Sequence, residues 1–319
     1  MPGLLNEIQA LITERGRDFR FALSGSSARR LKRADANLLA GRAINKQFFP
    51  LTAAELNRDF DIDQVLRFGL LPQIQAEPSF AVDVLDAYIE NYIREEIQQE
   101  ALVRNLDSFA RFLEIAALMN GQIANVAALA RDAAVARPTV QGYFATLVDT
   151  LIGFWLPAWR KRIKVKEVAS PKFYLFDPGV ARALAGRSRE PLDGAERGFL
   201  LETWVLHELR AAMSLHDTSG QLFYWRTPRG SEVDFIWTRG PRAIGIEVKA
   251  AATWRKEHGA ALKSLIKAGA LRTGYGVYTG TLELKDGPVR VFPLSRFLRK
   301  LASGALLVGQ GSRSRNAAP

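Results

Sequence analysis

Hydrophobic positions in the first half of the chain recur mainly at helical spacing, three to four residues apart. Each segment with this pattern is a predicted helix: residues 4–15, 81–99, 106–119, 126–132 and 137–147. A short strand is predicted at 20–24. Thr52 with Glu55 three positions later forms a capping box, a typical helix start. The pattern predicts a largely helical first half with a small contribution from strands.

A helix-turn-helix motif is predicted in the middle of the chain. The short helix 126–132 is followed by a tight turn and a second helix that opens with Pro138 in its first turn. Residues 155–159 and 160–166 could form a wing, so we expect a winged-helix-like domain. As a DNA reader, its second helix would present a group of polar side chains: Arg137, Thr139, Gln141 and Tyr143. The alternative is a winged-helix fold used only for packing or protein interaction.

The second half of the chain mixes strands with helices. The predicted elements are strand 172–176, helix 195–215, strands 233–237 and 243–249, helix 254–270 and strand 275–279. The first strand runs into Asp177-Pro178-Gly179, where Asp177 is expected to cap the next helix. This order predicts an α/β domain.

Strands 233–237 and 243–249 form a predicted β-hairpin around Gly240-Pro241. Symmetry about that turn places Asp234 opposite Glu247 and Glu232 opposite Lys249. Directly opposed residues share a face of the sheet, so these four polar side chains stand together. Ile244, Ile246 and Val248 then point to the other face, which is the expected core.

Opposed carboxylates repel each other unless a proton, a lysine or a divalent cation lies between them. Oxygen ligands suit a hard cation, so Asp234 and Glu247 are candidate Mg²⁺ ligands. Lys249 would then be placed to orient or polarise the water that attacks a phosphodiester. The alternative interpretation is a solvated polar face on an edge hairpin.

The spacing of these residues resembles the PD-(D/E)XK nuclease superfamily over roughly residues 187–301. That core has a helix with an acidic residue, a strand with Asp, a strand with Glu-x-Lys and a further helix. In this chain Glu202 lies on the apolar stripe of helix 195–215, where a carboxylate is costly unless it meets a cation or donors. The resemblance implies Glu202, Asp234, Glu247 and Lys249 as catalytic residues. Many relatives with this core have lost catalysis.

Three further segments, in order, resemble bacterial AAA-type ATPases that carry a C-terminal domain of unknown function, DUF4143. They are Ser24-Gly25-Ser26-Ser27, Leu39-Ala40-Gly41-Arg42 and the segment Pro50 to Leu56. The resemblance implies ATP as the cofactor of full-length relatives, Ser26 or Ser27 as a sensor-like polar group, and Arg42 as a γ-phosphate or subunit-interface arginine. It also matches Lys172, Tyr174, Asp177, Gly179 and Val180.

ATP hydrolysis is not expected of this chain. Its 319 residues contain no G-x-x-x-x-G-K-(S/T) loop to hold phosphates. In the family's arrangement the acidic Walker B residues would precede Met1. We therefore expect a chain that lacks its ATP-hydrolysing half, and the resemblance implies that oligomers can form.

Composition indicates the class of protein and its cellular compartment. A hydrophobic content of 48% and a charged content of 24% fit a globular domain, and the absence of cysteine excludes disulfides and thiolate zinc sites. No signal peptide or apolar run of about 20 residues is seen, so a cytoplasmic protein without membrane contact is expected. The net charge of +11 favours a polyanionic partner such as nucleic acid.

Together these patterns predict an α/β protein in three parts and a tail. Residues 1–80 form a partial AAA-type lid region, 81–168 a winged-helix-like domain, and 169–303 a PD-(D/E)XK-like domain. Residues 304–319, rich in Gly, Ser, Arg and Ala, are expected to be disordered. The favoured function is a Mg²⁺-dependent nuclease or a nucleic-acid-binding relic of one. The rival is a non-catalytic DNA-binding or protein-interaction module.

Overall fold

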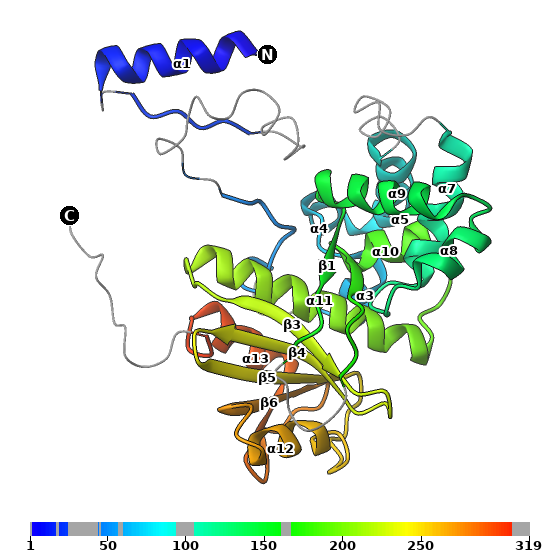
Figure 1. Ribbon diagram of the computed structural model, residues 1–319, viewed down its shortest axis with the longest axis vertical. Coiled ribbons are helices and arrows are strands. Elements are labelled where there is room, and N and C mark those ends of the chain that lie inside the picture. The colour runs from blue at the N-terminus through cyan, green and yellow to red at the C-terminus, as the bar shows by residue number, and fades with distance from the viewer. Residues whose placement is uncertain are drawn as a thin grey trace.

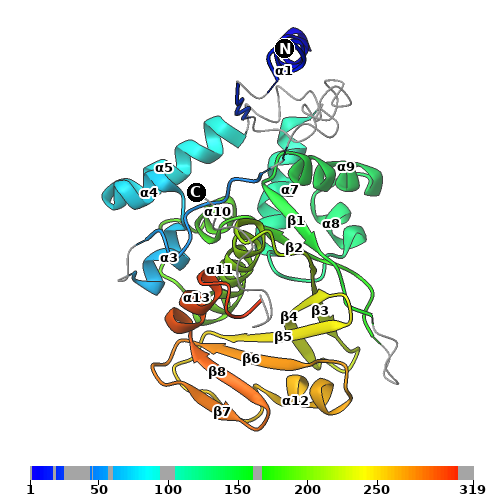
Figure 2. The same cartoon turned by 90° about the vertical axis from the view of Figure 1, so that its left-hand side faces the viewer.

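The computed structural model describes residues 2–16, 19–24, 44, 46–56, 60–93, 105–160 and 167–307. Helices dominate the first half: α1 (Pro2–Arg15), α3 (Ile62–Phe68), α4 (Pro72–Ala76), η2 (Pro78–Phe80), α5 (Ala81–Ala87), the π-helix η3 (Tyr88–Ile93), α7 (Leu106–Leu118), α8 (Val126–Asp132) and α9 (Arg137–Asp149). Figures 1 and 2 place α1 at one end of the molecule, away from the other helices.

Helices α7, α8 and α9 pack around an aromatic cluster. Phe109 and Tyr143 meet edge to face with ring centroids 4.9 Å apart, and Phe112 and Phe144 do the same at 4.9 Å. The predicted helix-turn-helix elements therefore exist as α8 and α9. Tyr143, however, is only 6% exposed, so its expected role in reading DNA is wrong. Its ring is part of the core that holds the helices together.

A two-stranded sheet follows α9. Strand β1 (Gly153–Leu156) pairs antiparallel with β2 (Lys172–Leu175), from Gly153↔Leu175 to Leu156↔Lys172. The predicted wing had paired 155–159 with 160–166, and residues 161–166 lie outside the described part of the chain. Strand β1 instead takes its partner from beyond that segment, which brings Lys172 into the fold beside the C-terminal sheet.

Three other predicted elements differ from the structure. Residues 19–24 contain no strand. Thr52 does form the capping-box bond, donating its backbone N–H to Glu55 Oε2 at 2.8 Å, but residues 53–55 are a turn rather than a helix, and residues 57–59 lie outside the described chain. Helix α12 (Ala260–Lys267) is shorter than the predicted 254–270, because residues 256–259 form a turn.

The C-terminal part is a six-stranded sheet in the order β3-β4-β5-β6-β8-β7. Its strands are β3 (Gln221–Arg226), β4 (Glu232–Arg239), β5 (Arg242–Lys249), β6 (Thr273–Tyr278), β7 (Leu284–Asp286) and β8 (Val289–Pro293). Strands β3, β4 and β5 pair antiparallel, whereas β6 lies parallel to both β5 and β8. The mixed α/β character predicted for this part is therefore confirmed.

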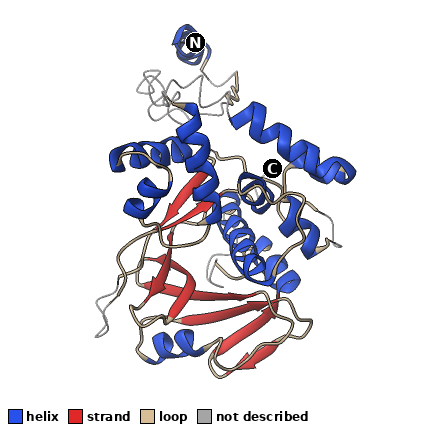
Figure 3. Cartoon of the chain, turned by 90° about the vertical axis from the view of Figure 1, so that its right-hand side faces the viewer, coloured by secondary structure: helices blue, strands red, loops and turns tan. Residues whose placement is uncertain are grey.

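Helices cover both faces of this sheet (Figures 2 and 3). On one face lie α11 (Gly194–Leu215) and α13 (Leu294–Ala302), in one core with Ile246 and Val248 of β5. On the other face α12 packs Leu262 and Leu265 in a second core with Ile236. The expected inward direction of Ile246 and Val248 is confirmed.

Helix α10 (Pro178–Leu184) joins the two halves. Asp177 accepts a 3.0 Å hydrogen bond from Val180 N–H, so its predicted role as the N-cap is confirmed. Its other carboxylate oxygen accepts from Leu70 N–H at 2.7 Å, which ties α10 to the end of α3. The predicted disordered tail begins too early: Leu306 and Leu307 are 7% and 4% exposed, and residues 308–319 lie outside the described chain.

Candidate active site

The β4–β5 hairpin positions the predicted acidic pair. Its strands pair from Arg239↔Arg242 at the turn to Phe235↔Ile246, which is the register predicted by symmetry about Gly240-Pro241. Gly240 has φ +56°, a left-handed conformation that glycine adopts at little cost. The turn therefore fixes the register of β4 against β5 as far as Ile246, whereas the predicted Asp234–Glu247 and Glu232–Lys249 pairs lie beyond the last paired residues.

A β-bulge on the other edge of β4 lies at Asp234. Trp225 pairs with Val233 and Phe223 with Ile236, so two β4 residues oppose one residue of β3. Asp234 is one of those two residues, and it is 4% exposed. Bulges re-aim side chains, and here Asp234 Oδ2 accepts a 2.7 Å hydrogen bond from Val248 N–H. Asp234 is thus held against the Glu247-Val248-Lys249 segment.

All four residues predicted as catalytic line one cavity of about 900 Å³: Glu202, Asp234, Glu247 and Lys249. Lys249 Nζ lies 2.6 Å from Glu247 Oε1. The second carboxylate oxygen of Glu247 is buried and has no hydrogen-bond partner within the described part of the chain. An acceptor of this kind is costly to bury, so a donor or a cation at this oxygen would stabilise the site.

The structure adds Lys172 and Tyr174 of β2 to this cluster. Lys172 Nζ lies 2.5 Å from Glu232 Oε1 and 3.8 Å from Glu202 Oε2. Tyr174 donates its hydroxyl to Glu202 Oε2 at 3.2 Å. Sequence reasoning placed both residues in a strand without assigning them to the site. The available signal was a lysine two positions from a tyrosine in an otherwise apolar strand, which puts both on one face.

Burial and mutual repulsion raise the pKa of each central carboxyl group. Burial, and after it the charge of Asp234, raise the pKa of Glu202 to about 8 against the opposing effect of Lys172. Burial also raises the pKa of Asp234, and burial together with Asp234 raises that of Glu247 well above its usual range. At neutral pH the cluster therefore holds protons that a cation could replace.

Lys249 behaves in the opposite way. Burial alone would lower its pKa, but the charges of Asp234 and Glu247 raise it by more, so the pKa lies above the ordinary value. The ammonium group is therefore charged at neutral pH and acts as a hydrogen-bond donor. It is placed to orient a water or to stabilise a developing negative charge, while a general base would have to be another group.

The carboxylates of the site suit a hard cation whose remaining ligands are water and substrate oxygens. No group of three or more His, Cys, Asp or Glu side chains is arranged to hold a metal ion in the part of the chain that the structure describes. Mg²⁺ is commonly held by one or two carboxylates, with waters and substrate phosphates at its other positions. Asp234 and Glu247, one of them with an unpartnered oxygen, fit that pattern.

The predicted nucleotide-contacting residues Ser26, Ser27 and Arg42 lie outside the described residues. Of the predicted DNA-reading side chains on α9, Arg137 and Gln141 are exposed and Thr139 is partly buried. None of the helices that the structure describes has the length and apolarity to cross a membrane.

Comparison with known proteins identifies the sheet-containing part. Residues 197–297 match a domain of unknown function, DUF4143. The chain carries a DUF4143 domain at its C-terminal side. Residues 59–191 match a second domain of unknown function, DUF8612. The site thus combines Glu202, Asp234, Glu247 and Lys249 of the DUF4143 domain with Lys172 of the preceding domain.

Two curated relatives carry no assigned function. The uncharacterized protein Rv2008c of Mycobacterium tuberculosis is 27% identical over 260 residues, which cover 79% of this chain and 57% of the relative. The uncharacterized protein Mb2031c of Mycobacterium bovis matches with the same identity and coverage. The aligned region therefore spans little more than half the length of these relatives.

Proposed function

We propose that the DUF4143 domain of this chain is a Mg²⁺-dependent phosphodiester hydrolase that acts on nucleic acid. The observation that carries the proposal is the buried, unpartnered oxygen of Glu247 beside Asp234, in a cavity of about 900 Å³. The order of elements supports it. Helix α11 with Glu202, strand β4 with Asp234, strand β5 with Glu247 and Lys249, and then α12, follow the order of the PD-(D/E)XK core.

Asp234 and Glu247 would hold the cation. When bound, Mg²⁺ supplies charge neutralisation and polarises a phosphoryl oxygen. Asp234 is suited to this role because its Oδ2 is fixed by Val248 N–H. Glu247 is suited because Lys249 occupies its Oε1 and leaves Oε2 free.

Lys249 and Glu202 would have different roles at the proposed cation site. Lys249 donates hydrogen bonds as a cation and would orient the attacking water or stabilise negative charge on the phosphate. Glu202 is held by Tyr174 and lies near Lys172, so its carboxyl group is fixed in place. Because its pKa is raised to about 8, Glu202 retains a proton near neutral pH until a cation or substrate changes its surroundings.

Nucleic acid is the proposed substrate class because of charge. The chain carries a net charge of +11. Arg226, which pairs with Glu232 at 3.2 Å and has a side chain 40% exposed, also lines the cavity. Phosphate contacts of this kind bind without reading sequence. We further propose that full-length relatives couple this domain to an AAA-type ATPase in an oligomer, with ATP bound outside the region that this chain covers.

Cleavage assays on end-labelled single-stranded DNA, duplex DNA and RNA test the proposal. We expect cleavage with Mg²⁺ or Mn²⁺, none with EDTA, and none in Asp234→Asn or Glu247→Gln. The matched control is Glu283→Gln, which changes a carboxylate paired with Arg290 and Arg296 away from the cavity and should cleave like the wild type. Cleavage that persists in Glu247→Gln contradicts the proposal. Binding without cleavage under any metal favours the non-catalytic module.

A further inference from the structure

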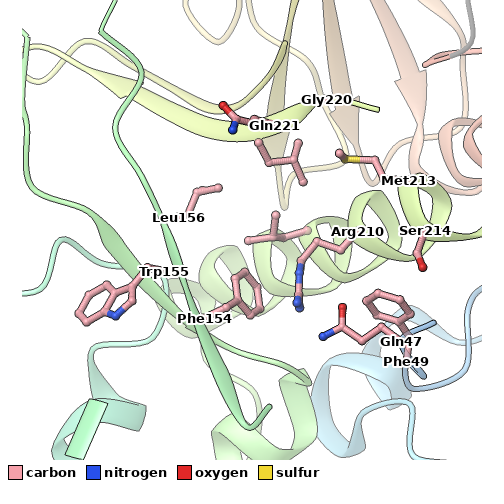
Figure 4. Close-up of a pocket in the computed structure, with 12 residues that line it drawn as sticks. Gln47, Phe49, Phe154, Trp155, Leu156, Arg210, Met213, Ser214, Gly220 and Gln221 are labelled. Atoms are coloured by element: carbon pink, nitrogen blue, oxygen red, sulfur yellow. The ribbon is translucent and has the colours of Figure 1, made fainter. Parts of the chain in front are cut away.

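A second cavity, of about 240 Å³, lies at the C-terminal end of α11 (Figure 4). Its walls come from α11, from β1, from the start of β3 and from the segment 46–50. Glu202, Asp234, Glu247 and Lys249 take no part in it. This cavity is therefore separate from the candidate active site.

The main polar feature of this cavity is Arg210. Its guanidinium lies over the Phe154 ring, 3.7 Å from the centroid, and 5.6 Å from the centroid of Phe49. Figure 4 shows the guanidinium between these two side chains. Aromatic rings stack on the faces of a guanidinium, which leaves the N–H groups at its edge to point elsewhere.

Those edge donors have no protein partner in the described structure. Arg210 forms neither an ion pair nor a hydrogen bond with any residue in the described ranges, whereas Arg182 of α10 and Arg197 at the start of α11 both pair with carboxylates. Burial lowers the pKa of Arg210 to about 10, so the group remains charged at neutral pH. A half-buried guanidinium with free donors is a strong binding group for a planar oxyanion.

The remaining walls restrict the ligand further. Among the described residues that line this cavity, Arg210 is the single charged side chain, so one negative charge would balance it. Leu206, Met213 and Leu222 provide an apolar surface beside it. A volume of about 240 Å³ admits a small molecule but not a folded partner.

We propose that this cavity binds a small amphipathic monocarboxylate. The carboxylate lies on the edge of the Arg210 guanidinium, and the apolar body lies against Leu206, Met213 and Leu222. A phosphate dianion fits less well, because the walls supply one positive charge against two negative ones.

Methyl NMR of the full chain tests this, because the chain has three methionines, Met1, Met119 and Met213. Met213 lines the cavity, whereas Met119 lies at the C-terminal end of α7 and serves as an internal control. Octanoate should shift the Met213 methyl signal and leave Met119 unchanged. Octanol, with the same chain but no charge, should bind at least about tenfold more weakly, since it loses the charge-assisted hydrogen bonds.

Two variants distinguish the contribution of the positive charge of Arg210 from that of its planar guanidinium group. Arg210→Gln should abolish the octanoate shift, Arg210→Lys should weaken it, and Arg290→Gln, at an exposed arginine over Phe292, should leave it unchanged. The proposal is overturned if octanol shifts Met213 as strongly as octanoate, or if octanoate leaves Met213 unmoved. The octanol comparison uses the wild type, so it decides the matter even if Arg210→Gln fails to fold.

Discussion

Asp234 Oδ2 accepts a 2.7 Å hydrogen bond from the backbone N–H of Val248, the residue between Glu247 and Lys249. The bond links the first carboxylate of the site to the strand that carries the second. It exists because the bulge in β4 removes Asp234 from regular pairing, so its side chain occupies a backbone donor. The position of the Asp234 carboxylate is therefore set by the β5 backbone rather than by free side-chain rotation.

Asparagine at position 234 should preserve that bond while removing the charge. The Asp234→Asn side-chain oxygen can still accept from Val248 N–H, and the repulsion with Glu247 disappears. We expect urea unfolding in EDTA to show unchanged or increased stability. Asp234→Ala should lower stability by about 1–3 kcal/mol, because a buried N–H loses its acceptor. Equal destabilisation by the two substitutions would contradict this assignment of the bond.

Lys172 should be a strong determinant of stability. Its side chain is 5% exposed and lies between Glu202 and Glu232. Lys172→Met therefore removes a buried cation from two partly buried carboxylates and leaves Glu232 with Arg226 alone. Breaking a buried pair in this way costs about 3–5 kcal/mol. The control Arg290→Met breaks an exposed pair with Glu283 and should cost under about 1 kcal/mol. Adding Glu232→Gln to Lys172→Met should restore part of the loss, and additive losses would argue against coupling.

Glu202 should give the metal-free protein a distinct pH dependence. Its pKa rises from 4.5 to about 8 through burial and then Asp234, with Glu232 adding and Lys172 and Lys249 opposing. The folded protein thus holds the proton more tightly than the unfolded chain does. That contribution to stability is complete below about pH 4.5 and is lost as pH rises toward about 8.

The variant Glu202→Gln imitates the protonated side chain at every pH. Its stability advantage over the wild type should therefore be small at pH 5, grow steadily and level off above pH 8. Between the unfolded and the folded pKa, the advantage grows by about 1.4 kcal/mol for each pH unit. Denaturant unfolding of both proteins in EDTA across this range measures it. A difference that stays constant with pH would show that Glu202 is not protonated in the folded state.

Nucleic-acid binding should depend steeply on salt. The net charge of +11 implies that contacts are made mainly to phosphates, which release counterions on binding. Fluorescence anisotropy with one labelled oligonucleotide in EDTA should show affinity falling linearly with salt on logarithmic axes. A second oligonucleotide of scrambled sequence should give the same line. Affinity that is flat between about 50 mM and 200 mM salt would indicate a partner recognised by other forces.

The arrangement of the hairpin could be predicted from the sequence because its turn and parity are local. Gly240-Pro241 sets the register, and alternation then places Asp234 against the Glu247 strand. Glu202 was also foreseeable, because a carboxylate on an apolar helical stripe needs a partner. Burial of both faces of the sheet was not foreseeable, because it depends on where α11, α12 and α13 dock.

Residues that reach a site only through contacts between distant segments could not be predicted from the sequence. Lys172 reaches the site because β2 pairs with β1 across residues that the local pattern treats as a wing. The capping bond between Thr52 and Glu55 predicted a helix start, but it forms in a described segment, residues 53–55, that is a turn. Arg210 was also overlooked, because its stacking on Phe49 and Phe154 joins segments distant in sequence.

The most direct test of the proposed cation site is the melting temperature of the wild type and of Asp234→Asn, each with excess Mg²⁺ and with EDTA. A cation that binds the native state at a hundredfold excess over its Kd adds about 2.7 kcal/mol of stability. We predict that Mg²⁺ raises the wild-type melting temperature by several degrees and leaves Asp234→Asn unmoved. A wild-type melting temperature that is the same with Mg²⁺ and with EDTA would contradict the account.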